Sequence, residues 1–98
     1  MDFKVLIADS AIEDLRGIVE FVAEDDPRAA ERLANKLIEC ALDLHALPYR
    51  CPVFDEQRGI RKITVSPYLI FCTCDDSCRI VNIIHFWYGS WWRPSFGE

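Results

Sequence analysis

The chain has 98 residues, of which 51% are hydrophobic and 28% charged, with only four glycines and five prolines. This composition indicates one folded domain, residues 1–98, and excludes a mainly disordered or collagen-like chain. Eleven Lys and Arg against 16 Asp and Glu give a net charge of -5, which argues against direct, nonspecific binding to nucleic acid. No apolar run approaches a bilayer span and the first residues do not resemble a signal peptide, so we expect a cytoplasmic protein without a membrane segment.

Residues 3–8 form a short apolar run rich in β-branched and aromatic side chains, which predicts a first strand. A helix should follow at once, because Ser10 and Glu13 have the spacing of a capping box with Ser10 as the N-cap. Apolar residues then recur at helical spacing from Ile12 to Val22. The first helix is therefore expected to be amphipathic.

A second helix is predicted to start at Asp26 and Pro27, because aspartate caps free backbone N–H groups and proline suits the first helical position. Its apolar stripe runs from Ala30 to Leu44, and Pro48 limits it. Two helices joined by so few residues form an antiparallel hairpin, one layer thick.

The rest of the chain is expected to be a loop at 48–59, three strands at 60–65, 68–74 and 79–86, and an aromatic tail at 87–98. The resulting order is β-α-α-β-β-β. The predicted fold class is α+β, with the helical hairpin packed on a small antiparallel sheet. The last two strands are apolar at both odd and even positions, so apolar side chains lie on both faces of the sheet and both faces must be covered. The hairpin can cover one face, and we expect a partner chain on the other.

Five cysteines without a secretory signal indicate reduced thiols. A zinc site made by Cys72, Cys74 and Cys78, with Cys51 as a fourth ligand, is one interpretation. The spacing argues against it, because Cys72 and Cys74 fall in a strand and not in a knuckle. Buried thiols acting as small hydrophobic side chains are the favoured interpretation, and neither a metal nor a cofactor is expected.

Three parts of the chain together resemble the RelE/ParE superfamily of toxins. The segment from Ala11 to Leu44 is similar to the opening of these toxins. Gly59–Ile63 followed by Pro67–Phe71 is similar to the central hairpin, and Val81–His85 to the final strand. The resemblance covers about residues 3–88. It implies the toxin of a type II toxin–antitoxin module, a plasmid stabilisation protein whose antitoxin wraps and inactivates it.

The superfamily has two activity classes, which are ribosome-dependent mRNA cleavage and poisoning of DNA gyrase. RNA cleavage through the 2′-OH needs a proton acceptor, a proton donor and cations near the phosphate. Relatives commonly follow the last-strand histidine with Gly or Ala and then arginine, whereas Phe86, Trp87 and Tyr88 follow His85 here. A ParE-like toxin that is not an enzyme and poisons DNA gyrase is therefore favoured. An endoribonuclease using Arg61, Lys62, His85 and Tyr88 and an inactive toxin-like binding module remain as alternatives.

Candidate contacts with the target or the antitoxin lie in the second half of the chain. Arg61 matches the family's strand arginine and could bind carboxylates, although an ion pair with an acid such as Glu20 would also explain it. His85 could act as a base or a contact, or donate to a backbone carbonyl at a strand end. Aromatic anchors dominate protein interfaces, so the remaining candidates come from the C-terminal end. They are Trp87, Tyr88, Trp91, Trp92 and Arg93.

Overall fold

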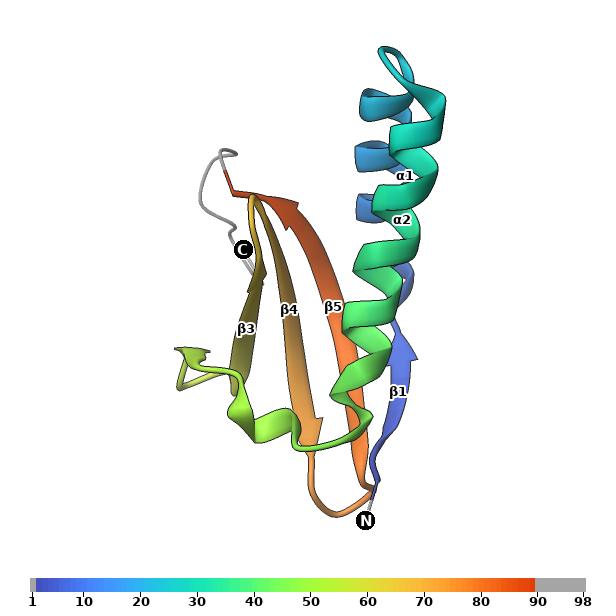
Figure 1. Ribbon diagram of the computed structural model, residues 1–98. Coiled ribbons are helices and arrows are strands. Elements are labelled where there is room, and N and C mark those ends of the chain that lie inside the picture. Colours follow the sequence, from blue (N-terminus) through green and yellow to red (C-terminus); the bar gives the residue numbers. More distant parts are fainter. Residues whose placement is uncertain (1, 90–98) are drawn as a thin grey trace.

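The computed structural model describes residues 2–89, which form two helices and a five-stranded sheet (Figure 1). The strands are β1 (Lys4–Ile7), β2 (Val53–Asp55), β3 (Ile60–Val65), β4 (Tyr68–Asp75) and β5 (Ile80–Tyr88), and the helices are α1 (Asp9–Ala23) and α2 (Pro27–Leu42). Two short 3-10 turns, Asp43–His45 and Pro48–Arg50, follow α2. None of the helices within residues 2–89 has both the length and the hydrophobicity that crossing a membrane requires.

The sheet confirms the α+β fold class and adds one feature that was not predicted. Its strand order is β1-β5-β4-β3-β2, and all neighbours are antiparallel except β1 and β5, which run parallel. A parallel pair needs a long connection, which the helical hairpin and the other three strands supply. The sheet is therefore mixed, with the first and last strands side by side.

The helical hairpin covers one face of the sheet and encloses the hydrophobic core (Figure 1). Because side chains alternate along a strand, every second residue points to that face. Buried side chains from the sheet and from both helices meet there: Ile18, Leu37, Ala41, Ile70, Cys72, Val81, Ile83 and Phe86. The apolar stripes of α1 and α2 thus face the sheet, as the helical spacing predicted.

One of the two predicted helix starts is confirmed and the other is wrong. Asp26 is the N-cap of α2, its carboxylate accepts two backbone N–H groups at 3.1 and 3.2 Å, and Pro27 is the first residue. α1 begins at Asp9 with Ala8 as its N-cap, so Ser10 lies inside the first turn and forms no capping box. The chain turns into α1 directly after the Ala8 N–H donates to the Ile83 carbonyl of β5, so the helix starts two residues before the predicted position.

Two predicted boundaries in the second half are also wrong. The segment 48–59, predicted to be a loop, contains a 3-10 turn and the three-residue strand β2 at the sheet edge. The last strand does not stop at Phe86. Because Trp87 and Tyr88 pair with β4, they belong to the sheet and not to an aromatic tail that begins at residue 87.

Candidate functional site

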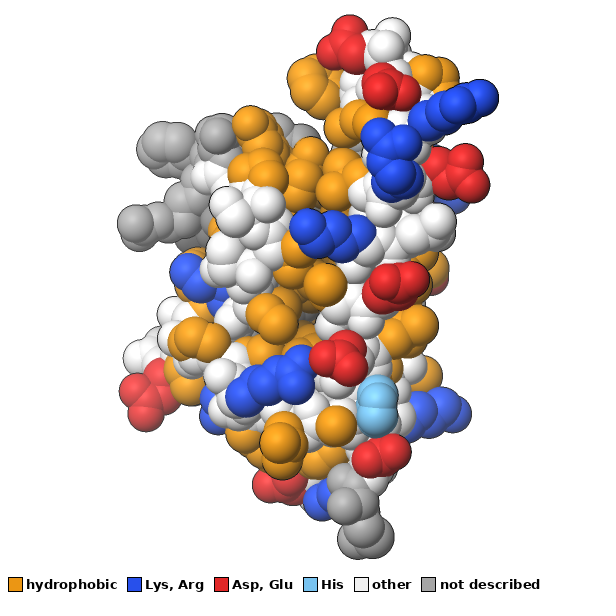
Figure 2. All heavy atoms as spheres, viewed as in Figure 1, with side chains coloured by type: hydrophobic (Ala, Val, Ile, Leu, Met, Phe, Trp, Pro, Cys, Tyr) orange, Lys and Arg blue, Asp and Glu red, His pale blue; other side chains and the backbone are white. Residues whose placement is uncertain are grey.

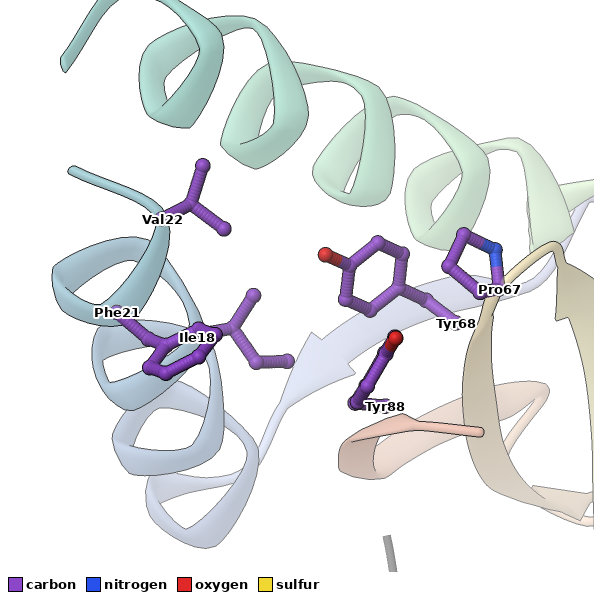
Figure 3. Close-up of a pocket in the computed structure, with 6 residues that line it drawn as sticks. All are labelled: Ile18, Phe21, Val22, Pro67, Tyr68 and Tyr88. Carbon is purple, nitrogen blue, oxygen red and sulfur yellow. The ribbon is translucent and has the colours of Figure 1, made fainter. Parts of the chain in front are cut away.

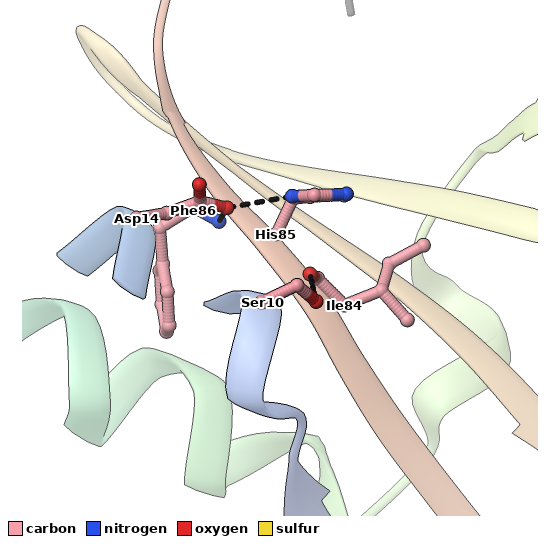
Figure 4. Close-up of polar contacts among 5 residues, drawn as sticks. All are labelled: Ser10, Asp14, Ile84, His85 and Phe86. Atoms are coloured by element: carbon pink, nitrogen blue, oxygen red, sulfur yellow. Dashed lines mark hydrogen bonds and ion pairs between the residues drawn. The ribbon is translucent and has the colours of Figure 1, made fainter. Parts of the chain in front are cut away.

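The far end of β5 and the first turns of α1 form a polar junction (Figure 4). β1 ends well before β5 does, so the backbone of β5 would otherwise have an open edge. Beyond the end of β1, side chains of α1 form hydrogen bonds with the backbone of β5. The Ser10 hydroxyl donates to the Ile84 carbonyl at 2.7 Å, and the Asp14 carboxylate accepts from the Phe86 N–H at 3.2 Å. The junction therefore satisfies backbone groups at the edge of β5 with side chains from 70 or more residues away in the sequence.

A β-bulge in β5 sets the geometry of this junction. Phe71 of β4 lies opposite His85, but the next residue of β4, Cys72, lies opposite Ile83. Ile84 is the extra residue, and its carbonyl is the one that Ser10 binds. A bulge bends its strand and re-aims nearby side chains. Here it returns Phe86 to the helix-facing side of the sheet, while His85 points to the other side.

His85 forms an ion pair with Asp14 across the edge of the sheet. Its Nδ1 lies 2.6 Å from Asp14 Oδ2, and both side chains are about three-quarters buried, with 26% and 23% exposed. Through Nδ1, His85 thus contacts a carboxylate, a partner that was not predicted from the sequence. Asp14 holds the proton on Nδ1 when the ring is neutral and thereby fixes the ring orientation.

This partly buried His–Asp pair resembles general-base machinery, whereas the longer pair of His45 Nδ1 with Asp2 Oδ2, at 3.4 Å, is more exposed to solvent. A carboxylate that orients an imidazole is a recurring part of such sites. Asp14 was not among the sequence-predicted site residues. No local spacing links Asp14 to a residue 71 positions away.

Arg61 is used inside the molecule. Its guanidinium Nη1 donates to the carbonyls of Cys51 at 2.7 Å and Tyr49 at 3.3 Å, and its Cζ lies 4.8 Å from the centre of the Tyr49 ring. The suggested ion pair with Glu20 is therefore wrong. Two carbonyls and a ring face satisfy the cation, and Arg61 fastens the segment after α2 to β3.

The four residues of the ribonuclease alternative lie on opposite faces of the sheet. Arg61 pairs in register with a core residue of β4, so it shares the helix-facing side, and Tyr88 pairs with Tyr68 on that side. Lys62 and His85 both pair with Phe71 and lie on the opposite side. Lys62 places its ammonium 5.7 Å from the Phe54 ring centre. The structure therefore does not bring these four side chains together.

An apolar groove lies between α1 and the sheet end that carries Tyr88 (Figure 3). Its cavity has a volume of about 180 Å³. Phe21 of α1, 69% exposed, lies on one side, and Tyr68 and Tyr88 lie on the other with ring centres 5.5 Å apart. Burial and the neighbouring Tyr88 raise the pKa of Tyr68. Figure 2 shows hydrophobic side chains gathered in the hollow between the two layers.

A tight backbone contact involves Pro67, which lines the groove at its sheet side. The N–H of Gly89 donates to the carbonyl of Pro67 at 2.7 Å. A Cβ at Gly89 would lie 2.7 Å from the same oxygen, so glycine is required there. This contact fastens the end of β5 to the β3–β4 turn.

Three of the predicted contact residues cannot be placed. Trp91, Trp92 and Arg93 lie outside the described residues 2–89. Trp87 can be placed: it lies on the same side of β5 as His85, and the two ring centres are 6.1 Å apart in an edge-to-face arrangement. The predicted contacts that the structure describes therefore divide between the groove side, with Arg61 and Tyr88, and the opposite side, with His85 and Trp87.

Cys51, Cys72 and Cys74 behave as small hydrophobic side chains, whereas Cys78 is exposed. Cys51 and Cys72 are buried, and Cys74 is partly buried on the same face of β4 as Cys72. Burial raises the pKa of the Cys72 thiol to about 12, with the neighbouring Cys74 and Cys51 thiols adding to the effect. At neutral pH this thiol is protonated and inert, which agrees with its interpretation as part of the core.

Comparison with known proteins identifies the family. Residues 5–90 match the family described as ParE toxin of type II toxin-antitoxin system, parDE. The chain belongs to the ParE toxin family. A comparison with curated proteins found no match. The family match covers both sides of the junction, from β1 to the end of β5.

Solved structures share the fold of this ParE-family toxin. The toxin–antitoxin complex RelBE2 from Mycobacterium tuberculosis has 22% identity and a TM-score of 0.67, over 90% of this chain and 99% of that one. The chromosomal ParDE system from P. aeruginosa has 17% identity and a TM-score of 0.74, over 88% and 95%. A RelE toxin mutant from E. coli in the free state has 17% identity and a TM-score of 0.57, over 92% and 86%. The predicted membership in the RelE/ParE superfamily is confirmed: the chain is a type II toxin of RelE/ParE fold.

Proposed function

We propose that this ParE-family toxin arrests growth as a binding protein that poisons DNA gyrase, and that it is not a ribonuclease. In this mechanism the toxin binds gyrase so that the DNA-cleavage intermediate persists. The toxin would act in the cytoplasm as one domain without a cofactor. The observation that carries the proposal is the division of the candidate catalytic residues between two sheet faces.

Cleavage of RNA needs its catalytic groups within hydrogen-bond reach of one phosphate. Neighbouring strand residues such as Arg61 and Lys62 point to opposite sides of the sheet. Arg61 is the cation that the ribonuclease alternative needs at the phosphate, and it already binds two carbonyls on the helix-facing side. Lys62 and His85 lie on the opposite face of the sheet from Arg61. One phosphate cannot contact both sets.

We further propose that a cognate antitoxin neutralises the toxin by covering the apolar groove. An exposed phenylalanine and two tyrosine rings line this groove, which favours an apolar partner surface. The adjacent end of α1 carries Glu20, Glu24 and Asp25, so basic residues beside that apolar surface would complement it. The similar ParDE and RelBE2 structures come from toxin–antitoxin systems, which supports an antitoxin partner.

The test is induced expression in a bacterial host without antitoxin, with a DNA-damage reporter and transcript cleavage read in one culture. Gyrase poisoning predicts growth arrest, an active reporter and intact transcripts. A Lys62→Ala variant should arrest growth as well as the parent, whereas a Phe21→Asp, Tyr88→Ala variant should no longer bind the antitoxin. Arrest with cut transcripts would support the ribonuclease instead. Normal growth with soluble toxin would indicate an inactive binding module.

A further inference from the structure

The two edges of the sheet differ in how far they are protected from pairing with another chain. The edge strands are β2 and β1 (Figure 1). β2 has three residues, follows Pro52 and has an irregular register between Val53 and Asp55. Shortness, proline and bulges are devices that keep an edge strand from accepting a further strand. β1, Lys4–Ile7, contains neither a proline nor a register shift, so its outer edge lacks these two devices.

The outer edge of β1 presents backbone groups that no strand within residues 2–89 reaches. The N–H groups of Lys4 and Ala8 donate toward β5, at 2.8 and 2.9 Å. The N–H of Phe3 points the other way and donates at 2.7 Å to a carbonyl of the 3-10 turn that follows α2. Backbone groups alternate in direction along a strand, so those of Val5 and Ile7 point outward as that of Phe3 does.

A second copy of β1 fits this edge in one antiparallel register. With Val5 opposite Ile7 of the second copy, and Ile7 opposite Val5, each opposed pair exchanges two N–H···O=C bonds. A shift of the register in one direction would bring in Phe3, whose N–H is already bound. A shift in the other direction would bring in Asp9, which belongs to α1. The edge therefore specifies its own register, about a two-fold axis at Leu6.

The side chains of β1 suit this two-fold arrangement. Val5 and Ile7 pack against the core on the helix-facing side, so Lys4 and Leu6 lie on the opposite side of the sheet. The Leu6 side chain is 40% exposed there. At the two-fold axis it would face Leu6 of the second copy in a pair without hydrogen bonds, with the two Cα atoms about 4.5 Å apart. Pairing would thus remove apolar surface of both leucines from water.

The charges beside this leucine pair are also complementary. In the same register Lys4 lies opposite Ala8 of the second copy, next to Asp9 of that copy. Neither Lys4 nor Asp9 forms an ion pair with another residue of the described chain. The two-fold symmetry would create this pairing of opposite charges twice, once on each side of the axis.

We propose that the toxin forms a two-fold dimer through β1, in which two five-stranded sheets join into one continuous sheet. The occupant is a second copy of this chain, because the open backbone groups, the leucine at the axis and the opposite charges on its two sides all come from residues 4–9. None of these residues lines the apolar groove. The dimer can be measured without gyrase or antitoxin, so its test is independent of the proposed function.

The test is analytical ultracentrifugation of the purified full-length toxin from low micromolar to millimolar concentration. A reducing agent keeps the exposed Cys78 from cross-linking two copies. We expect a reversible monomer–dimer equilibrium. Amide hydrogen exchange under the same conditions should show protection of the Val5 and Ile7 N–H groups that rises with the fraction of dimer, whereas protection at Phe3 should already be present in the monomer.

Variants identify the interface. Leu6→Lys places two like charges at the axis and should raise the dimer dissociation constant by at least about tenfold. The matched control is Val53→Lys, which adds the same charge at an exposed position of the other edge strand and should leave the constant unchanged. Lys4→Glu should raise the constant by about fivefold, and the charge swap Lys4→Glu, Asp9→Lys should restore it. Circular dichroism checks that each variant is folded.

Three results would overturn the proposal. The first is a toxin that stays monomeric at millimolar concentration. The second is a dimer that a folded Leu6→Lys variant leaves intact, because the two copies would then meet at another surface. The third is protection of the Val5 and Ile7 N–H groups that appears only when antitoxin is added, because the strand that pairs with β1 would then belong to the antitoxin.

Discussion

The two faces of the sheet use the same alternation of side chains for different purposes. On the helix-facing side, Ile70, Cys72 and Phe86 are buried against the hairpin, and Arg61 is tied to backbone carbonyls. On the other side, Lys62 and His85 lie at partly exposed positions. Residues that are neighbours in the sequence are therefore separated by a layer of packed sheet. Residues of catalytic types on neighbouring strands can form one active site only if their side chains lie on the same face of the sheet.

The largest expected loss of stability comes from truncating a buried side chain on the helix-facing side of the sheet. Phe86→Ala removes a fully buried ring and should lower the free energy of unfolding by about 3–5 kcal/mol. Leu69→Ala, on the other side and partly exposed, should cost much less. Chemical denaturation of both variants measures the difference. Equal losses would mean that the two faces of the sheet are packed alike.

Substitution at the polar junction between α1 and β5 should have the next largest effect on stability. Asp14→Ala leaves the Phe86 N–H and the His85 ring without their acceptor, which should cost about 1.5–3 kcal/mol because both bonds go to a charged group. Asp14→Asn keeps an acceptor and should cost less. Amide hydrogen exchange at Phe86 reports the junction directly. Unchanged protection in Asp14→Ala would show that this bond contributes little.

A smaller contrast separates two adjacent cations. Arg61→Ala loses two hydrogen bonds to carbonyls, and we expect a loss of about 1–2 kcal/mol, whereas Lys62→Ala should stay within about 0.5 kcal/mol of the parent. Thermal unfolding of the two variants gives the comparison. A Lys62 variant that is as destabilised as the Arg61 variant would contradict the roles assigned to the two residues.

The smallest expected effect is a dependence on alkaline pH. The folded state raises the pKa of Cys72 from 9.0 to about 12 by burial, so the thiol stays neutral while an unfolded chain ionises. Stability that is complete below the unfolded pKa should therefore fall as the pH rises above 9, by about 1 kcal/mol at about pH 10. Denaturation at several pH values measures the slope. Cys72→Ala should flatten it, and an unchanged slope would place the effect elsewhere.

Local sequence signals predicted the elements whose partners are close in the chain. The cap at Asp26 and the strand at 60–65 are both as predicted, because an N-cap and an apolar run are local features. β2 was not predicted because three residues are too few to give a recognisable alternation of apolar and polar side chains. Ser10 was misassigned because its hydroxyl bonds to β5 and not to its own helix, a contact that no local spacing contains.

The candidate site also combines a residue that the local sequence singles out with a partner that only the fold brings to it. His85 could be singled out from the sequence, because it ends a β-rich run that resembles the final strand of the family. Its partner Asp14 could not, since the parallel pairing of β1 with β5 and the bulge at Ile84 create that contact. The separation of Arg61 from His85 by the sheet could have been inferred from strand alternation, but only with the register in hand.

The most direct test of the proposed function uses purified components. Purified toxin is added to DNA gyrase and supercoiled plasmid, and cleaved DNA is measured after denaturation, with translating ribosomes and mRNA in a parallel reaction. Gyrase poisoning predicts that cleaved DNA rises with toxin concentration, equally for the parent and for Lys62→Ala, while the mRNA stays intact. Cleaved mRNA that disappears in the Lys62→Ala variant, with no effect on gyrase, would contradict the proposal.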